Sequence, residues 1–185
     1  MSGSFQDKTQ LAKLVAQLAV VHGKVTLSSG IEADYYVDLR RATLHHEAAV
    51  LVGKVMLDLF AEAGLEPDAV GGLTMGADPV ASAMLHQASA RGLQLDAFVV
   101  RKEAKKHGMA RQVEGPDIEG HKVVILEDTS TTGGSPLTAA KAAEEAGAEV
   151  LAVATVVDRD TGARAAIESA GYAYYSALSL SDLGL

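Results

Sequence analysis

Short apolar runs separated by polar turns recur along the chain and predict the strands of a buried sheet. The longest runs are rich in β-branched residues and lack polar alternation, as is typical of parallel strands covered on both faces. They cover residues 69–73, 95–100, 123–126, 149–157 and 172–178.

Between these strands, apolar residues recur every three to four positions, the spacing of one buried helix face. Segments with this spacing cover residues 7–21, 45–63, 80–91, 137–146 and 163–170. Alternating strands and helices predict an α/β fold in which a central parallel sheet is flanked by helices on both faces. We find no internal repeat or low-complexity linker, so we expect one domain over residues 1–185.

Ahead of the sheet, two shorter strand patterns at 25–27 and 35–39 flank a Ser-Ser-Gly turn at 28–30. Two interpretations are open. The segment is either a plain hairpin with exposed tyrosines, or a hood over a ligand pocket that places Tyr35 or Tyr36 beside a flat ring.

The chain of 185 residues carries 16 Lys and Arg against 24 Asp and Glu, a formal net charge of −8. This balance disfavours binding to nucleic acid or to an anionic membrane, so an anionic ligand needs a local basic patch. The absence of cysteine excludes disulfides and thiolate catalysis, and agrees with a reducing cytosol. We find no signal-peptide pattern and no apolar run near the ~20 residues of a membrane span. Arg40 and Arg41, after the second short strand, are expected to form surface salt bridges.

The segment VVILEDTSTTGGS, residues 123–135, joins a buried strand to a helix through small and hydroxylated residues. Ser135 and Pro136 predict the helix start, with Ser as N-cap and Pro at the first helical position. Backbone N–H groups and the helix dipole attract an anion to such a turn. The adjacent carboxylates of Glu127 and Asp128 would repel a phosphate, but they accept hydrogen bonds from sugar hydroxyls or help to hold a metal. The segment therefore predicts a ligand that carries both a phosphate and a polyol. It is not a Walker loop, because no Lys follows the glycines.

A second strand-to-helix turn, TMGADP at 74–79, also contains a glycine. By itself this turn is a weak signal and fits an ordinary loop. Beside the first turn, it becomes a second candidate anion site that relies on backbone donors and a helix dipole.

The run RKEAKKHG at 101–108 is the concentrated basic segment of an acidic chain. Most such runs are simply solvated. This one directly follows an apolar strand, where sites of α/β proteins lie. It also leads into residues 109–120, which have little periodicity, as a mobile lid would. Its cationic or titratable residues are Arg101, Lys102, Lys105, Lys106 and His107.

Residues 123–135 resemble the motif with which type I phosphoribosyltransferases bind 5-phosphoribosyl 1-diphosphate (PRPP). The resemblance implies that Glu127 and Asp128 hold the ribose hydroxyls. It implies that the following loop holds the 5′-phosphate through Thr129, Ser130, Thr131, Thr132, Gly133, Gly134 and Ser135. The second turn resembles the pyrophosphate loop of these enzymes, which here consists of Thr74, Met75, Gly76 and Ala77.

The basic run closely resembles the catalytic loop of the orotate phosphoribosyltransferases. This resemblance implies that Arg101 and Lys102 contact the phosphates, while Lys105 and His107 close over the leaving pyrophosphate. Either Lys105 or His107 could donate a proton to it. Together with Asp128, these two residues form the implied catalytic set.

At the other substrate, the resemblance implies that Arg159, after the strand at 149–157, grips the orotate carboxylate. Arginine suits this role because its planar fork pairs a carboxylate bidentately. Thr131 would contact the same ring.

The N-terminal segment resembles the hood of these enzymes, which implies that Ser29, Gly30 and Tyr36 lie near orotate. Many members carry Lys at the position of Ser28, and some carry one in the pyrophosphate loop. This chain carries Ser28 and, in that loop, Gly76.

The resemblance implies an enzyme that makes orotidine 5′-monophosphate and pyrophosphate from orotate and PRPP in pyrimidine synthesis. It implies Mg²⁺ held mainly through PRPP, with no direct protein ligand expected. It also implies a cytoplasmic homodimer whose catalytic loop reaches the neighbouring site. The expected parts are a hood at about 1–40, a core at about 45–178 and a mobile loop at about 101–120.

Two other functions are compatible with parts of this pattern. A phosphoribosyltransferase for another base, such as a purine, is disfavoured by the basic loop and by Arg159, because a purine has no carboxylate to grip. A non-catalytic regulator that senses PRPP and binds nucleic acid is disfavoured by the net charge of −8 and by the intact Lys105 and His107.

Overall fold

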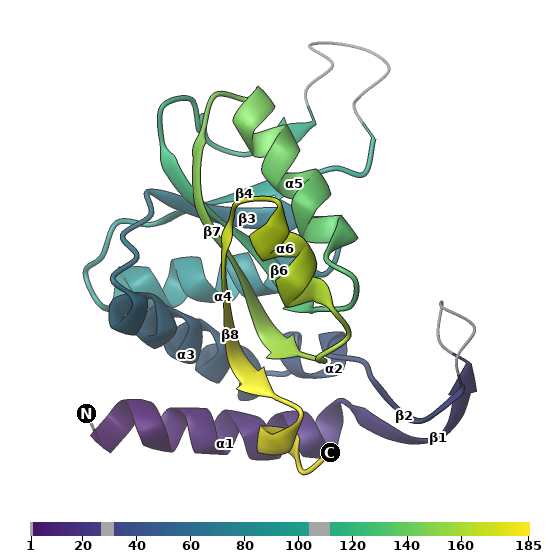
Figure 1. Ribbon diagram of the computed structural model, residues 1–185. Helices are drawn as coiled ribbons and strands as arrows, with labels where there is room; N and C mark the ends of the chain where they lie inside the picture. Colours follow the sequence, from purple (N-terminus) through teal and green to yellow (C-terminus); the bar gives the residue numbers. More distant parts are fainter. Residues whose placement is uncertain (1, 27–31, 104–111) are drawn as a thin grey trace.

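The computed structural model describes residues 2–26, 32–103 and 112–185, and it is built around a six-stranded sheet (Figure 1). The order across the sheet is β5-β4-β3-β6-β7-β8. All neighbouring pairs are parallel except β4 and β5, which are antiparallel at one edge. The strands are β3 (Ala69–Leu73), β4 (Asp96–Val100), β5 (Val113–Glu114), β6 (Lys122–Thr129), β7 (Glu149–Asp158) and β8 (Ala173–Ser179).

Helices cover both faces of this sheet, which confirms the predicted α/β architecture. One face is covered by α3 and α4, with α1 packed outside α3, and the other by α5 and α6 (Figure 1). The helices are α1 (Ser2–Leu18), α2 (Arg40–Thr43), α3 (Ala48–Ala63), α4 (Ala77–Ala90), α5 (Gly134–Glu145), α6 (Ala163–Ser169) and the 3₁₀ turn η1 (Ser181–Leu183).

The pleat of β6 explains why its apolar run is continuous. Val124 and Leu126 belong to the core under α3 and α4, whereas Val123 and Ile125 belong to the core under α5. Successive side chains of a strand point to opposite faces, so a strand covered on both sides needs apolar residues at every position.

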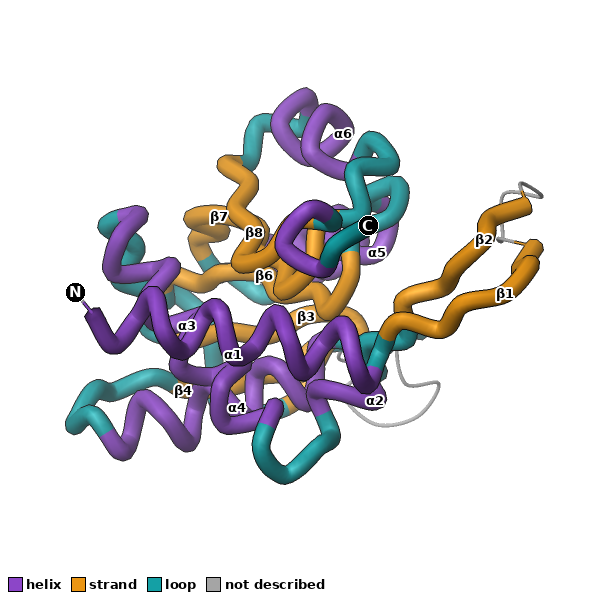
Figure 2. Tube along the Cα trace, turned by 90° about the horizontal axis from the view of Figure 1, so that it is seen from below, coloured by secondary structure: helices purple, strands orange, loops and turns teal. Residues whose placement is uncertain are grey.

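A separate antiparallel hairpin, β1 (Val20–Thr26) and β2 (Glu32–Val37), projects from the body near α2 (Figure 2). Both strands begin earlier in the chain than the sequence pattern predicts. Val37 and Leu39, at the base of the hairpin, are buried in the main core and attach it there.

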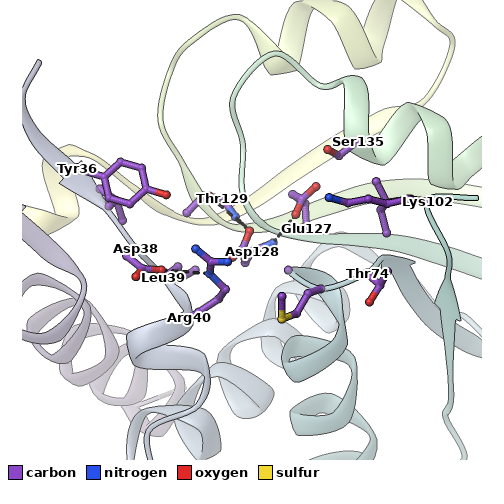
Figure 3. Close-up of a pocket in the computed structure, with 14 residues that line it drawn as sticks. Tyr36, Asp38, Leu39, Arg40, Thr74, Lys102, Glu127, Asp128, Thr129 and Ser135 are labelled. Atoms are coloured by element: carbon purple, nitrogen blue, oxygen red, sulfur yellow. Dashed lines mark hydrogen bonds and ion pairs between the residues drawn. The ribbon is translucent and has the colours of Figure 1, made fainter. Parts of the chain in front are cut away.

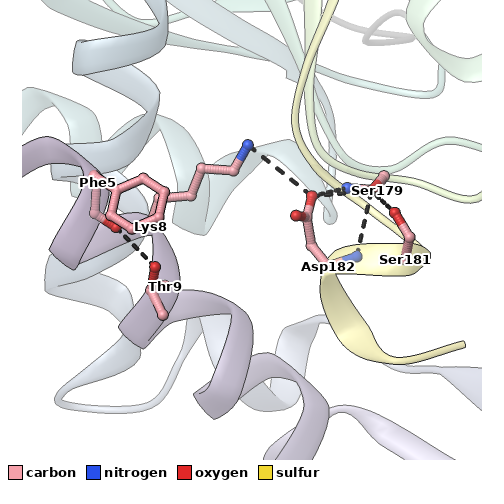
Figure 4. Close-up of polar contacts among 6 residues, drawn as sticks. All are labelled: Phe5, Lys8, Thr9, Ser179, Ser181 and Asp182. Atoms are coloured by element: carbon pink, nitrogen blue, oxygen red, sulfur yellow. Dashed lines mark hydrogen bonds and ion pairs between the residues drawn. The ribbon is translucent and has the colours of Figure 1, made fainter.

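Asp182 makes the polar contacts that join η1 to β8, and one ion pair that joins η1 to α1 (Figure 4). The Asp182 carboxylate accepts hydrogen bonds from the Ser179 backbone N–H at 2.8 Å and from its hydroxyl at 2.9 Å, and it lies 4.0 Å from Lys8 Nζ. The hydrogen bond from the Ser179 N–H contributes most to lowering the pKa of Asp182. No helix among the described residues is long and apolar enough to cross a membrane.

Two local predictions differ from the structure. The helix predicted over 45–63 is α3, which begins three residues later at Ala48, and His45 Nδ1 accepts the backbone N–H groups of Glu47 and Ala48 at 3.4 and 3.5 Å ahead of it; the short helix α2, before the predicted range, was not predicted. Ser135 is not the N-cap of α5, because Gly133 takes a left-handed φ of +83° and starts the helix two residues earlier.

Candidate active site

A cavity of about 270 Å³ opens where β3 and β6 end, beside the start of α2 (Figure 3). Residues from the hairpin, from the ends of three strands and from the starts of three helices meet there. They are Tyr36, Val37, Asp38, Leu39, Arg40, Leu73, Thr74, Met75, Gly76, Lys102, Glu127, Asp128, Thr129 and Ser135.

The acid pair lies in the last three residues of β6, so the strand backbone places both carboxylates at the cavity. Asp128 Oδ1 accepts the Thr129 N–H at 2.7 Å, and Glu127 Oε1 accepts the Asp128 N–H at 3.3 Å. Burial, and after it the negative charge of Asp128, raises the pKa of Glu127 to about 8. The pair therefore holds a proton near neutral pH and is ready to exchange hydrogen bonds with hydroxyl groups.

The turn before α4 faces the acid pair closely. A Cβ at Gly76 would lie 2.8 Å from Glu127 Oε1 and 2.9 Å from Asp128 Oδ1, so a side chain there would displace both carboxylates. Gly76 is also the N-cap of α4 and makes no side-chain cap. Thr74 Oγ1 donates to Asp78 Oδ2 at 2.7 Å, and the peptide bond between Thr74 and Met75 is cis. The first turn of α4 thus presents backbone N–H groups beside the carboxylates.

The turn before α5 has the same construction. Gly133, its N-cap, makes no side-chain cap, and a Cβ there would lie 3.3 Å from the Ala163 carbonyl oxygen and from Ile167 Cγ1. Thr131, Thr132, Gly134 and Ser135 around it are exposed, and Ser135 lines the cavity. The structure therefore brings two helix N-termini without side-chain caps to one edge of the sheet, where each is suited to an anion.

Cations of the basic run are placed differently from one another. Lys102 lines the cavity and points toward Glu127 (Figure 3). Arg101 is not a lining residue, and its guanidinium lies 3.5 Å from Glu114 Oε1. Lys105 and His107 lie outside the described residues.

A hydrogen-bonded network joins the loop after β6 to the loop after β7. The buried Ser130 hydroxyl donates to Asp158 Oδ1 at 2.7 Å and accepts the Arg159 N–H at 3.1 Å. The same Asp158 oxygen accepts the Asp160 N–H at 2.9 Å. Thr161 Oγ1 donates to the Thr131 carbonyl oxygen, in the loop after β6, at 2.6 Å. These contacts fix the backbone that carries Arg159.

Arg159 and Tyr36 come from distant parts of the chain and meet at the base of the hairpin. The Arg159 guanidinium lies 5.7 Å from the centre of the Tyr36 ring, within the range of a cation–π contact. Of the residues expected beside the flat ring of orotate, Ser29 and Gly30 lie outside the described residues.

Sequence patterns did not identify Asp38 and Arg40 as cavity residues. The predicted salt bridge of Arg40 is present, with Nε 3.2 Å from Asp38 Oδ1. The structure adds that the pair lines the cavity (Figure 3). Nothing in the local pattern signals this, because it depends on how the hairpin packs against the sheet.

Taken together, the site can hold a phosphorylated sugar with a second phosphate group. The acid pair suits hydroxyls, the two helix N-termini suit separate anions, and Lys102 and Arg40 supply positive charge. Among the described residues, no group of three or more His, Cys, Asp or Glu could hold a metal ion without other ligands.

Comparison with known proteins agrees with this chemistry. A family model described as the phosphoribosyl transferase domain matches residues 42–170. An orotate phosphoribosyltransferase of Streptomyces coelicolor is 67% identical over 177 residues, covering 95% of this chain and 96% of the relative. One of Mycobacterium tuberculosis is 59% identical over 179 residues, covering 97% of each.

Solved structures show the same likeness. The Mycobacterium tuberculosis orotate phosphoribosyltransferase in complex with Fe(III) dicitrate matches with a TM-score of 0.87 at 59% identity, covering 97% of this chain and 99% of that one. A structure of that protein in complex with PRPP matches with a TM-score of 0.83 at 54% identity and the same coverage.

Proposed function

The chain belongs to the orotate phosphoribosyltransferases, and from this premise we propose how its residues bind the two substrates and transfer the phosphoribosyl group. Its substrates are PRPP and orotate, and its products are proposed to be orotidine 5′-monophosphate and pyrophosphate, as a step of UMP synthesis. One observation carries the residue assignment: the acid pair of β6 lies in a single cavity beside a helix start that has no side-chain cap.

PRPP is proposed to lie along the edge of the sheet. Glu127 and Asp128 accept the ribose hydroxyls. The backbone of the loop from Thr129 to Ser135 holds the 5′-phosphate at the N-terminus of α5. The backbone from Thr74 to Ala77 holds the diphosphate at the N-terminus of α4.

Orotate is proposed to lie against the hairpin. Arg159 forms an ion pair with the orotate carboxylate, Thr131 contacts the orotate ring, and Tyr36 covers one side of that ring. Ser29 and Gly30 are proposed to complete this part of the site. The network around Ser130 supports the assignment, because it holds the Arg159 backbone to the loop that binds PRPP.

The reaction is a displacement at the anomeric carbon of the ribose. A bond forms from an orotate ring nitrogen to this carbon, and the proton of that nitrogen is released to water. The bond to the diphosphate oxygen breaks, and its electron pair leaves with pyrophosphate. Arg101, Lys102, Lys105 and His107 are proposed to stabilise the charge that builds on this group, and Lys105 or His107 to donate a proton to it. Positioning by the acid pair accounts for much of the remaining acceleration.

Mg²⁺ is the proposed cofactor, held mainly through PRPP. The described residues fit such an ion, since Mg²⁺ commonly takes one or two carboxylates together with substrate phosphates and waters. Of the three carboxylates that line the cavity, Glu127 and Asp128 are the two that lie beside the start of α4. When bound, the ion supplies charge stabilisation to the departing diphosphate.

A cytoplasmic homodimer is proposed, in which the loop carrying Lys105 enters the neighbouring site. To test the dimer, the variants Lys105→Ala and Arg159→Ala are mixed and refolded together. The first lacks the proposed contact to pyrophosphate, and the second lacks the proposed contact to the orotate carboxylate. If the loop acts across subunits, half of the dimers carry one intact site, and activity should return to about a quarter of the wild-type value. Recovery of no activity would contradict a shared site.

The test of the reaction follows orotate absorbance after mixing the protein with PRPP and Mg²⁺. We expect loss of the orotate band that added pyrophosphate reverses. Turnover of a purine base instead would keep the PRPP site and discard the role of Arg159. No turnover of any base would favour a regulatory function, which a gel shift with pyrimidine-operon nucleic acid would then test.

Arg159 has a matched control on the next helix. Arg159→Gln should raise the KM for orotate by about 100-fold, as expected when a bidentate charged contact is lost. Arg164→Gln removes an equal charge that contacts Glu168 and Tyr174 instead, and it should leave this KM nearly unchanged.

A further inference from the structure

The cavity that receives PRPP has an unfavourable charge balance in the described part of the chain. Its lining includes three carboxylates, Asp38, Glu127 and Asp128, against two cations, Arg40 and Lys102. PRPP brings a phosphate and a diphosphate to this place. Each cation at the cavity wall is therefore needed, and of these two only Lys102 belongs to the basic run.

Arg40 has a fixed backbone at the mouth of the cavity. It is the first residue of α2, and its neighbours Leu39 and Ala42 are both buried in the core. The side chain itself is 46% exposed, so it can be reached by a ligand. Rigid backbone and accessible head group are the properties of a binding residue.

The orientation of the guanidinium is set by Asp38. Only Nε donates to that carboxylate, at 3.2 Å, and within the described residues the two terminal nitrogens donate to no other group. Figure 3 shows the guanidinium lying between Asp38 and Asp128. The Asp38 hydrogen bond contributes most to raising the pKa of Arg40, and the charge of Asp128 adds to it. The free edge of the fork therefore faces the acid pair.

The terminal nitrogens of Arg40 lie near the place where the ribose and the diphosphate of PRPP are expected to join. Gly76, the N-cap of α4, packs against both carboxylates of the pair and lines the same cavity as Arg40. A ligand whose hydroxyls reach Asp128 and whose diphosphate reaches the start of α4 passes in front of the guanidinium. Arginine is suited to this contact because two parallel N–H groups match two phosphate oxygens.

We propose that Arg40 is a PRPP-binding residue contributed from the base of the hairpin, whose terminal nitrogens donate to the diphosphate opposite Lys102. Asp38 is its positioning partner. The inference rests on the proposed function, since it places the diphosphate of PRPP at the start of α4. It adds a cation that lies outside both the PRPP motif and the basic run.

The neighbouring arginine provides a matched control. Arg41 has the same charge and also lies in α2, but it is exposed and does not line the cavity. Arg40→Gln, Arg40→Lys and Arg41→Gln are compared by calorimetric titration with PRPP and Mg²⁺ in the absence of orotate. Steady-state kinetics with both substrates accompany the titration.

Arg40→Gln should weaken PRPP binding by about 30-fold, the effect expected for a charge-assisted bidentate contact. Arg40→Lys should recover part of this loss, because it restores the charge without the fork. The KM for orotate at saturating PRPP should change by less than about threefold, and Arg41→Gln should stay within about twofold of the wild type throughout.

The inference is overturned if Arg40→Gln binds PRPP as tightly as Arg41→Gln does. It is also overturned if the orotate KM rises as much as the PRPP dissociation constant, since the contact would then not be specific to PRPP. Failure of the wild-type protein to bind PRPP or consume orotate would instead refute the proposed function. The two failures are therefore distinguishable in one set of measurements.

Discussion

Gly76→Ala is the substitution whose effect the structure defines most sharply. The new Cβ would lie 2.8 Å from Glu127 Oε1 and 2.9 Å from Asp128 Oδ1, whereas ordinary contacts begin near 3.4 Å. Both carboxylates must therefore move by about 0.5 Å. Because these atoms are the free ends of side chains, the backbone of the sheet need not shift, and the disturbance should fall on binding rather than on folding.

The magnitude follows from that displacement. A misplacement of about 1 Å can cost about 100-fold in rate, so about 0.5 Å at both carboxylates proposed to bind the ribose should lower kcat/KM for PRPP by about tenfold. This loss corresponds to about 1.4 kcal/mol of transition-state stabilisation. The melting temperature should change little.

Steady-state kinetics with varied PRPP test this prediction, with thermal unfolding measured in parallel. Gly92→Ala is the control, because Gly92 follows the other end of α4 and a Cβ there meets nothing within 4 Å. An alanine held at the Gly92 φ of +70° should lower stability by about 1 kcal/mol and leave the kinetics unchanged. Wild-type kcat/KM in Gly76→Ala would refute the argument that this glycine makes room for the acid pair.

Three further predictions concern stability and substrate coupling. Gly72→Ala places a Cβ against the Leu126 backbone carbonyl oxygen of β6, so it should prevent folding or lower the melting temperature severely, as circular dichroism would report. Ser130→Ala removes the hydrogen bond that the Ser130 hydroxyl donates to Asp158 and the one that it accepts from the Arg159 N–H. It should cost about 2 kcal/mol of stability and raise the KM for orotate more than the KM for PRPP. An unchanged KM for orotate would contradict this prediction. Burial raises the pKa of Glu127 to about 8, so the folded protein keeps a proton that the unfolded chain releases near pH 4.5, and stability falls as pH rises between these values. Glu127→Gln should remove that fall, so that calorimetry finds the ligand-free variant more stable than the wild type at pH 8 and similar to it near pH 4.5.

Features that depend on neighbours in the chain were predictable from the sequence. The strand over 69–73 has the predicted bounds, and the other central strands differ from their predictions by a few residues at their ends. Apolar periodicity reports burial of nearby residues, and the order of strands and helices restricts the sheet to a parallel arrangement. The acid pair and the small residues after it carry their chemistry in their own side chains and backbone. For the same reason, they resemble a known motif, and this resemblance predicts the substrate that they bind.

Features that depend on packing between distant segments came only from the tertiary structure. The hairpin brings Arg40 and Asp38 to the cavity, and the pairing of β6 with β7 brings Ser130 to Asp158. Arg101 and Lys102 are adjacent in the chain, yet only Lys102 lines the cavity. The sequence determined which chemical groups this protein has at its strand ends. The fold decided which of them share one cavity, because that depends on side-chain direction and on contacts between residues far apart in the chain.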